Sequence, residues 1–105
     1  MGEIDDLRAR IDDLDARLVA LLNERAACAL AIGQVKEREG LPVYQPAREA
    51  EVLRRVCETN GGPLDDGAIR RLFERIIDEA RRLERIAAGD RQHGGEPPGR
   101  TVQSE

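Results

Sequence analysis

The sequence contains few of the residues on which many catalytic centres depend. Aromatic residues make up 2% of the 105 residues, only Tyr44 and Phe73, and tryptophan is absent. One histidine, His93, and two cysteines, Cys28 and Cys57, lack the spacing of a metal site. Neither a histidine-based catalytic centre nor a zinc site is therefore expected. The thiols are expected to be reduced residues of an apolar core in a cytoplasmic protein.

A basic surplus and a membrane segment are lacking as well. The formal net charge is -4 although 36% of the residues are charged, and there are few aromatic side chains on which bases could stack. These features argue against a nucleic-acid-binding protein. No secretory signal pattern is present at the N-terminus, and no apolar run approaches the roughly 20 residues of a membrane span. We therefore expect a cytoplasmic protein that does not insert into membranes.

What the sequence does contain is helical periodicity, in three stretches. The first runs from Ile4 to Glu37, with apolar residues at heptad-like spacing. Gly40 and Pro42 end it, Pro46 suits the first turn of a second helix, and that helix ends near Asn60. A third helix is expected to begin at a cap, Asp65 or Asp66, and to end near Ala88. The predicted fold is all-α, with one long and two shorter helices.

The length of the first helix has a consequence for assembly. At 1.5 Å per residue it spans roughly 50 Å, whereas a compact domain of this size has a radius of gyration of about 13 Å. Two short helices cannot cover its apolar seam, so we expect an intertwined homodimer. Residues 1–88 form the predicted domain. Residues 89–105 lose the periodicity, are rich in Gly and Pro, and are expected to be a disordered tail.

Several charged residues fall on the inner faces of these helices. Arg25 occupies an apolar heptad position, and Lys36 follows it by about three turns on the same stripe. Glu49 and Glu84 lie on the apolar faces of the second and third helices, and Arg8 lies beside the seam. Such charges could pair with one another or extend to water. Together, however, they favour an internal cationic pocket for a small dicarboxylate.

The remaining charges are interpreted as solvated surface. The arginines of the third helix alternate with acidic residues at helical pair spacing. They comprise Arg70, Arg71, Arg75, Arg81, Arg82 and Arg85.

The order of three motifs resembles the all-helical chorismate mutase family. They are LRARIDDLDARLVALLNERAACALAIGQVK, LPVYQPAREAEVLRRV and LDDGAIRRLFERIIDEARRLE. The resemblance implies an intertwined homodimer with shared active sites. It also implies that chorismate is converted to prephenate, without cofactor or metal, in phenylalanine and tyrosine biosynthesis.

The resemblance further implies roles for individual residues. Arg8 matches an arginine supplied by the other subunit, and Arg25 matches one that binds a substrate carboxylate. Lys36 matches a lysine that bridges a carboxylate and the ether oxygen of chorismate. Glu84 matches the residue of the third helix that hydrogen-bonds this ether oxygen, so Lys36 and Glu84 are the predicted catalytic pair.

Four more predicted site residues flank these. Arg48 and Glu49 match an Arg-Glu pair whose glutamate holds the C4 hydroxyl of the substrate. Gln45 stands where an aspartate is common, at a contact made largely by the backbone. Ala80 replaces a serine that touches a carboxylate, which removes one hydrogen bond worth about 0.5–1.5 kcal/mol.

Other functions are compatible with the same motifs. Two related activities are those of an isochorismate pyruvate lyase and of a mutase acting on 4-amino-4-deoxychorismate; Glu49 would accept either a hydroxyl or an ammonium. A non-catalytic helical dimerisation module is a third alternative, but it would not need to keep Arg25 and Lys36. The sequence leaves open whether a partner enzyme activates the chain.

Overall fold

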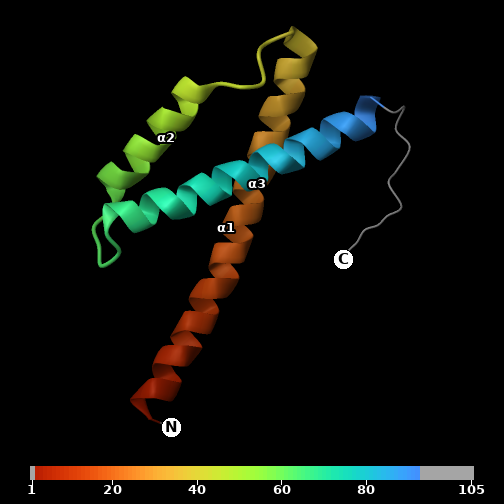
Figure 1. The fold of residues 1–105 in the computed structure, drawn as a ribbon. Coiled ribbons are helices and arrows are strands. Elements are labelled where there is room, and N and C mark those ends of the chain that lie inside the picture. The colour runs from red at the N-terminus through yellow and green to blue at the C-terminus, as the bar shows by residue number, and fades with distance from the viewer. Residues whose placement is uncertain (1, 93–105) are drawn as a thin grey trace.

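The computed structural model describes residues 2–92, with side chains up to residue 89. Its secondary structure consists of three helices, α1 (Glu3–Glu39), α2 (Pro46–Thr59) and α3 (Asp66–Gln92). Figure 1 shows the long α1, with α3 crossing it and α2 lying to one side. The predicted all-α fold, with one long and two shorter helices, is confirmed.

The helix ends follow from local chemistry. Gly40 ends α1 in the left-handed conformation, with φ of 69°, and the N–H of Leu41 donates to the carbonyl of Lys36 at 2.8 Å. Pro46 occupies the first turn of α2. Asp65 caps α3, since its Oδ1 accepts the N–H of Ala68 at 2.7 Å. The helices therefore begin and end within a few residues of the predicted positions.

The C-terminal end of α3 differs from the prediction. The helix continues past Ala88 to Gln92, because one glycine at position 89 weakens a helix by only about 1 kcal/mol. The rest of the predicted tail, including His93, lies outside the described residues.

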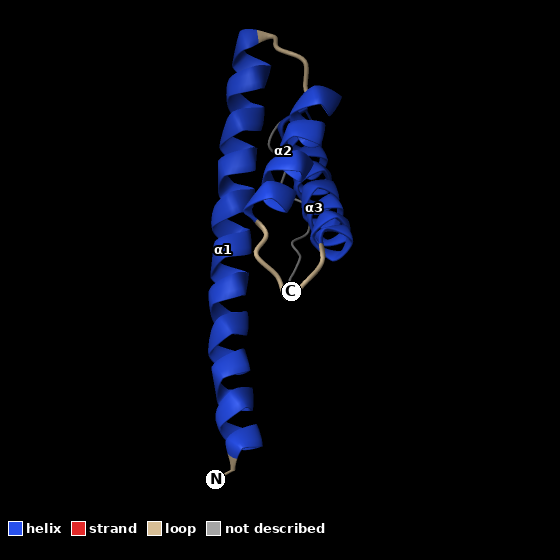
Figure 2. Ribbon diagram, turned by 90° about the vertical axis from the view of Figure 1, so that its left-hand side faces the viewer, coloured by secondary structure: helices blue, strands red, loops and turns tan. Residues whose placement is uncertain are grey.

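α3 holds the three helices together. It packs against both α1 and α2, and Figure 2 shows α2 and α3 on one side of the straight α1 rod. The radius of gyration is 17.5 Å, well above the roughly 13 Å of a compact domain of this length. The single chain is therefore an open arrangement of helices.

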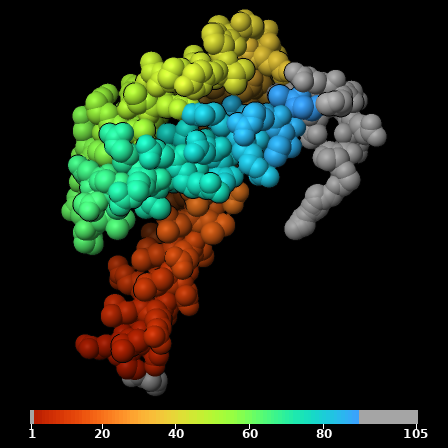
Figure 3. All heavy atoms as spheres, viewed as in Figure 1, coloured from red at the N-terminus to blue at the C-terminus, as the bar shows by residue number. Residues whose placement is uncertain are grey.

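No side chain in the described part of this open chain is buried. The N-terminal half of α1 projects from the other helices in Figure 3. Its apolar seam is left in solvent, with Ile4 64% and Leu7 59% exposed. The two cysteines, which we expected in the core, are also accessible: Cys28 is exposed and Cys57 half-buried. An apolar surface of this extent is typical of an interface.

α1 also qualifies by length and composition as a candidate membrane span. The expectation that no segment comes near a membrane span was therefore too strict. The core helix of a soluble protein meets the same criteria, and α1 carries Arg25 and Lys36 into the charged cleft described below.

Candidate active site

A cleft of about 380 Å³ lies between α1, the loop that follows it, α2 and α3. Seven of the eight predicted site residues line this cleft: Arg25, Lys36, Gln45, Arg48, Glu49, Ala80 and Glu84. They come from all three helices and are far apart in the sequence. The structure thus brings seven of the predicted site residues together in one cleft.

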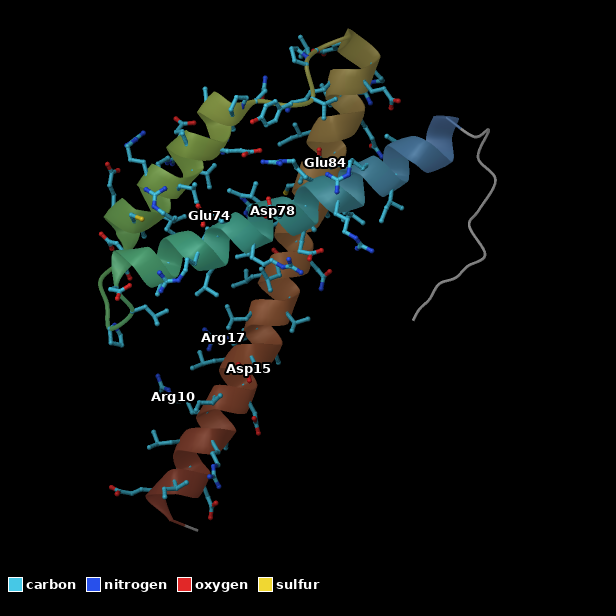
Figure 4. The ribbon with its side chains drawn as sticks, viewed as in Figure 1. Arg10, Asp15, Arg17, Glu74, Asp78 and Glu84 are labelled. Carbon is cyan, nitrogen blue, oxygen red and sulfur yellow. The ribbon has the colours of Figure 1, made fainter. Side chains whose placement is uncertain are left out.

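Arg8 is the predicted site residue that does not reach the cleft. It is exposed on the projecting half of α1. Figure 4 labels Arg10, Asp15 and Arg17 on this half and Glu84 where α3 crosses α1. Within one chain, Arg8 is thus separated from the other seven predicted site residues.

α1 contributes two cations and the apolar residues between them. Arg25 and Lys36 are both half-buried, and Ala29 and Ile32 line the cleft between them. The Lys36 ammonium donates a hydrogen bond to the carbonyl oxygen of Val43 at 3.4 Å. This bond ties the loop after α1 to the cleft, so that loop and lysine are positioned together.

Glu84 lies at the point where α3 crosses α1. A Cβ atom on Gly33 would come within 3.6 Å of Glu84 Oε1. This is an ordinary van der Waals distance, so a methyl group fits at Gly33, whereas a larger side chain would compete with Glu84 for the space between the helices. Glu84 is half-buried there and lines the same cleft as Lys36.

Glu49 is engaged by a residue that the sequence analysis assigned to the solvated surface. Arg81 Nε donates to Glu49 Oε2 at 2.7 Å, and Arg81 Nη2 donates to Glu49 Oε1. The guanidinium also lies 5.6 Å from the centre of the Tyr44 ring, a cation–π distance. The interpretation of Arg81 as a surface arginine was wrong: its side chain is 37% exposed and lines the cleft.

The position of Arg81 in the sequence is compatible with either a cleft residue or a surface residue. Arg81 follows Ala80 and lies one turn from both Ile77 and Glu84, at the edge of the apolar stripe of α3. Its acidic neighbour Asp78 offers a local partner at i−3, and this spacing led to the surface interpretation.

Arg48 occupies an exposed position at the edge of the cleft. Its Nη1 pairs with Glu51 Oε1 at 2.7 Å. This hydrogen bond, and then the charge of Arg48, lower the pKa of the Glu51 carboxyl below its ordinary value. An exposed pair of this kind contributes little to stability, so Arg48 can exchange Glu51 for a ligand carboxylate at small cost.

The charges of the cleft do not cancel. Four cationic side chains line it, those of Arg25, Lys36, Arg48 and Arg81, against the acidic side chains of Glu49 and Glu84, so that the net charge is +2 when both acids are ionised. A dianion of small size would restore neutrality. No group of three or more His, Cys, Asp or Glu side chains within the described range is arranged to hold a metal ion.

Fold and site together define a class: an all-helical protein whose crossing helices enclose a small, positively charged cleft. The family model of chorismate mutase type II matches residues 7–85. The chain belongs to this family.

Curated relatives with related names are similar to the chain. A bifunctional chorismate mutase/prephenate dehydratase of Stutzerimonas stutzeri is 42% identical over 92 residues, which cover 80% of this chain and 25% of the relative. The chain thus spans only a quarter of that protein. A 4-amino-4-deoxychorismate mutase of Streptomyces pristinaespiralis is 37% identical over 84 residues, 77% of this chain and 64% of the relative.

Solved structures share the fold over nearly their whole length. Chorismate mutase from Thermus thermophilus has a TM-score of 0.78 at 36% identity, covering 80% of this chain and 96% of that one. Chorismate mutase from Helicobacter pylori, solved in complex with prephenate, has a TM-score of 0.75 at 30% identity, covering 83% and 94%.

Substitutions at Gly33 test the helix crossing. The space at Gly33 accepts a methyl group at ordinary contact distance, so Gly33→Ala should keep the free energy of unfolding or raise it by up to about 1 kcal/mol. Gly33→Leu should displace the Glu84 side chain and lower the rate at saturating substrate at least about tenfold, as misplaced catalytic groups do. Thermal melts and steady-state kinetics of the two variants measure this, and equal rates would contradict the role of Gly33.

Proposed function

We propose that the chain is a chorismate mutase, which rearranges chorismate to prephenate as a cytoplasmic homodimer without a cofactor. The observation that carries the proposal is the convergence of Arg25, Lys36, Arg48, Glu49 and Glu84 on one cleft of net charge +2. Membership of the family supports it, as does the related structure in complex with prephenate.

The proposed reaction is an intramolecular rearrangement. The ether C–O bond to the ring breaks while a C–C bond forms between the enolpyruvyl methylene carbon and the ring, so no proton or electron leaves the substrate. The chain's residues then need to supply only orientation and electrostatic stabilisation. Arg25 and Arg48 would hold the two carboxylates in the folded conformer, which lowers the entropic part of the barrier.

Lys36 and Glu84 would act on the ether oxygen. Negative charge grows on this oxygen as the C–O bond breaks, and a positioned donor that meets it there raises the rate. The Lys36 ammonium, held at the cleft by the Val43 carbonyl, would supply a positive charge. The carboxyl group of Glu84, seated over Gly33, would supply a second donor.

A second copy of the chain would complete the site. The exposed seam on the projecting half of α1 is an apolar surface that a partner's helices can cover, and Arg8 lies on that half. Arg8 would therefore reach the partner's cleft and add another positive charge for a carboxylate. The mutase unit would comprise residues 1–88, with the remaining residues dispensable for turnover.

The reaction itself gives the direct test. Purified protein without added cofactor should consume chorismate, seen as loss of its absorbance, and chromatography should show prephenate as the product. Lys36→Met should reduce the rate by about 10²–10³-fold, the usual effect of removing a donor to a developing charge. Release of pyruvate from isochorismate would instead indicate a lyase, and inactivity on every substrate would favour a dimerisation module.

Composite sites can be tested by mixing two inactive chains. Arg8→Ala removes a contribution to the partner's site, whereas Lys36→Ala removes one from the chain's own site. A mixed dimer of the two variants contains one intact site, so mixing should restore up to about half of the activity per mixed dimer. Each variant alone is the control, and a fully active wild-type monomer in sedimentation experiments would contradict the arrangement.

Two substitutions test the role of Glu84. Glu84→Gln places an amide donor of similar shape at this position, so it should keep substantial activity. Glu84→Ala removes the group and should lower kcat about 10²–10³-fold, the usual effect of removing a donor to a developing charge. Steady-state kinetics of both variants measure this, and an unchanged kcat in Glu84→Ala would show that Glu84 is not the donor.

A further inference from the structure

The carboxylate of Glu49 is not free to act alone. Both of its oxygens accept from Arg81, through Nε and through Nη2. The two residues come from different helices, 32 positions apart, and both are partly shielded, with side chains 37% and 27% exposed. The pair is therefore part of the cleft wall rather than a surface contact between helical neighbours.

Further contacts fix Arg81 in this arrangement. The ring of Tyr44, on the loop before α2, lies against the guanidinium at 5.6 Å. The hydrogen bond to Glu49 is also the leading cause that raises the pKa of Arg81 above its ordinary value, so the cation stays charged at every accessible pH. Arg81 thus connects α3, α2 and the loop at one side of the cleft.

The ion pair changes what Glu49 offers to a ligand. A carboxylate has about four acceptor positions on its two oxygens, and Arg81 occupies two of them. The remaining positions can still accept a hydrogen bond from a neutral hydroxyl. A bare carboxylate would attract an ammonium strongly, but Glu49 and Arg81 together carry no net charge, and the guanidinium itself would repel an ammonium beside it.

We infer that Arg81 is a specificity-determining positioning residue that makes the cleft prefer a neutral hydroxyl over an ammonium at C4 of the substrate. The inference rests on the proposed function, in which Glu49 contacts the C4 substituent. In terms of substrates, it predicts a preference for chorismate over 4-amino-4-deoxychorismate. The total charge of the cleft favours the same choice, since the amino compound carries one negative charge fewer than the dianion that matches the cleft's +2.

Steady-state kinetics with both substrates tests this preference. The measured quantity is the ratio of kcat/KM for 4-amino-4-deoxychorismate to kcat/KM for chorismate. Arg81→Gln frees the Glu49 carboxylate and should raise this ratio roughly tenfold. Glu49→Gln leaves the cation without its partner and should lower the ratio. Arg81→Lys keeps the charge and should keep the ratio near that of the wild type.

A double variant and a matched control sharpen the test. Arg81→Gln combined with Glu49→Gln restores local neutrality, so the ratio should return toward the wild-type value even if both rates are low. Arg82→Gln removes the same charge from the next position of α3, where the side chain is 66% exposed and faces Glu79. This control should leave the ratio unchanged.

The outcomes separate the inference from the proposed function. Inactivity of the wild type on both substrates would refute the proposed function. An active wild type whose ratio does not move in Arg81→Gln would overturn the inference alone, and equal losses on both substrates would show that Arg81 binds a carboxylate they share. If Arg81→Gln fails to fold by circular dichroism, the lower ratio expected for Glu49→Gln and the near-wild-type ratio expected for the double variant still decide the question.

Discussion

The long apolar seam of α1 is the constraint on which the rest of the structure depends. A helix of 37 residues exposes far more apolar surface than α2 and α3 can cover, and no described side chain is buried in the single chain. α3 alone packs against both other helices. The cleft therefore forms where α3 crosses α1, with α2 on its other side. The projecting half of α1 keeps its apolar seam in solvent.

All three helices contribute charges to the cleft. α1 contributes only cations, Arg25 and Lys36, whereas α2 and α3 each contribute one cation and one acid: Arg48 with Glu49, and Arg81 with Glu84. The hydrogen bond from Lys36 to Val43 and the cation–π contact of Arg81 with Tyr44 attach the loop after α1 to both α1 and α3. A rearrangement without nucleophile or redox step requires fixed charges of this kind more than reactive side chains.

Sequence patterns predicted those features that depend on local periodicity. Heptad spacing placed Arg25 and Lys36 on one stripe of α1. Pro46 predicted where α2 begins, and a cap at Asp65 or Asp66 predicted where α3 begins. Arg81 was missed because its partner, Glu49, lies 32 positions away on another helix, and only the packing of α2 on α3 brings them together. The same limit applies to Gly33, whose contact with Glu84 depends on where two helices cross.

The pairing of Glu49 with Arg81 also explains how an acidic residue can line a cleft of net positive charge. Without Arg81 the net charge of the lining side chains would fall from +2 to +1, and the unpaired carboxylate would repel an anionic ligand. With Arg81 attached, the charge of Glu49 is balanced locally, while its oxygens keep free acceptor positions for a hydrogen-bond donor. Because the pair is only partly shielded, neither ion bears the full desolvation cost of a buried pair. One small cleft can therefore combine a net positive charge with hydrogen-bond acceptors.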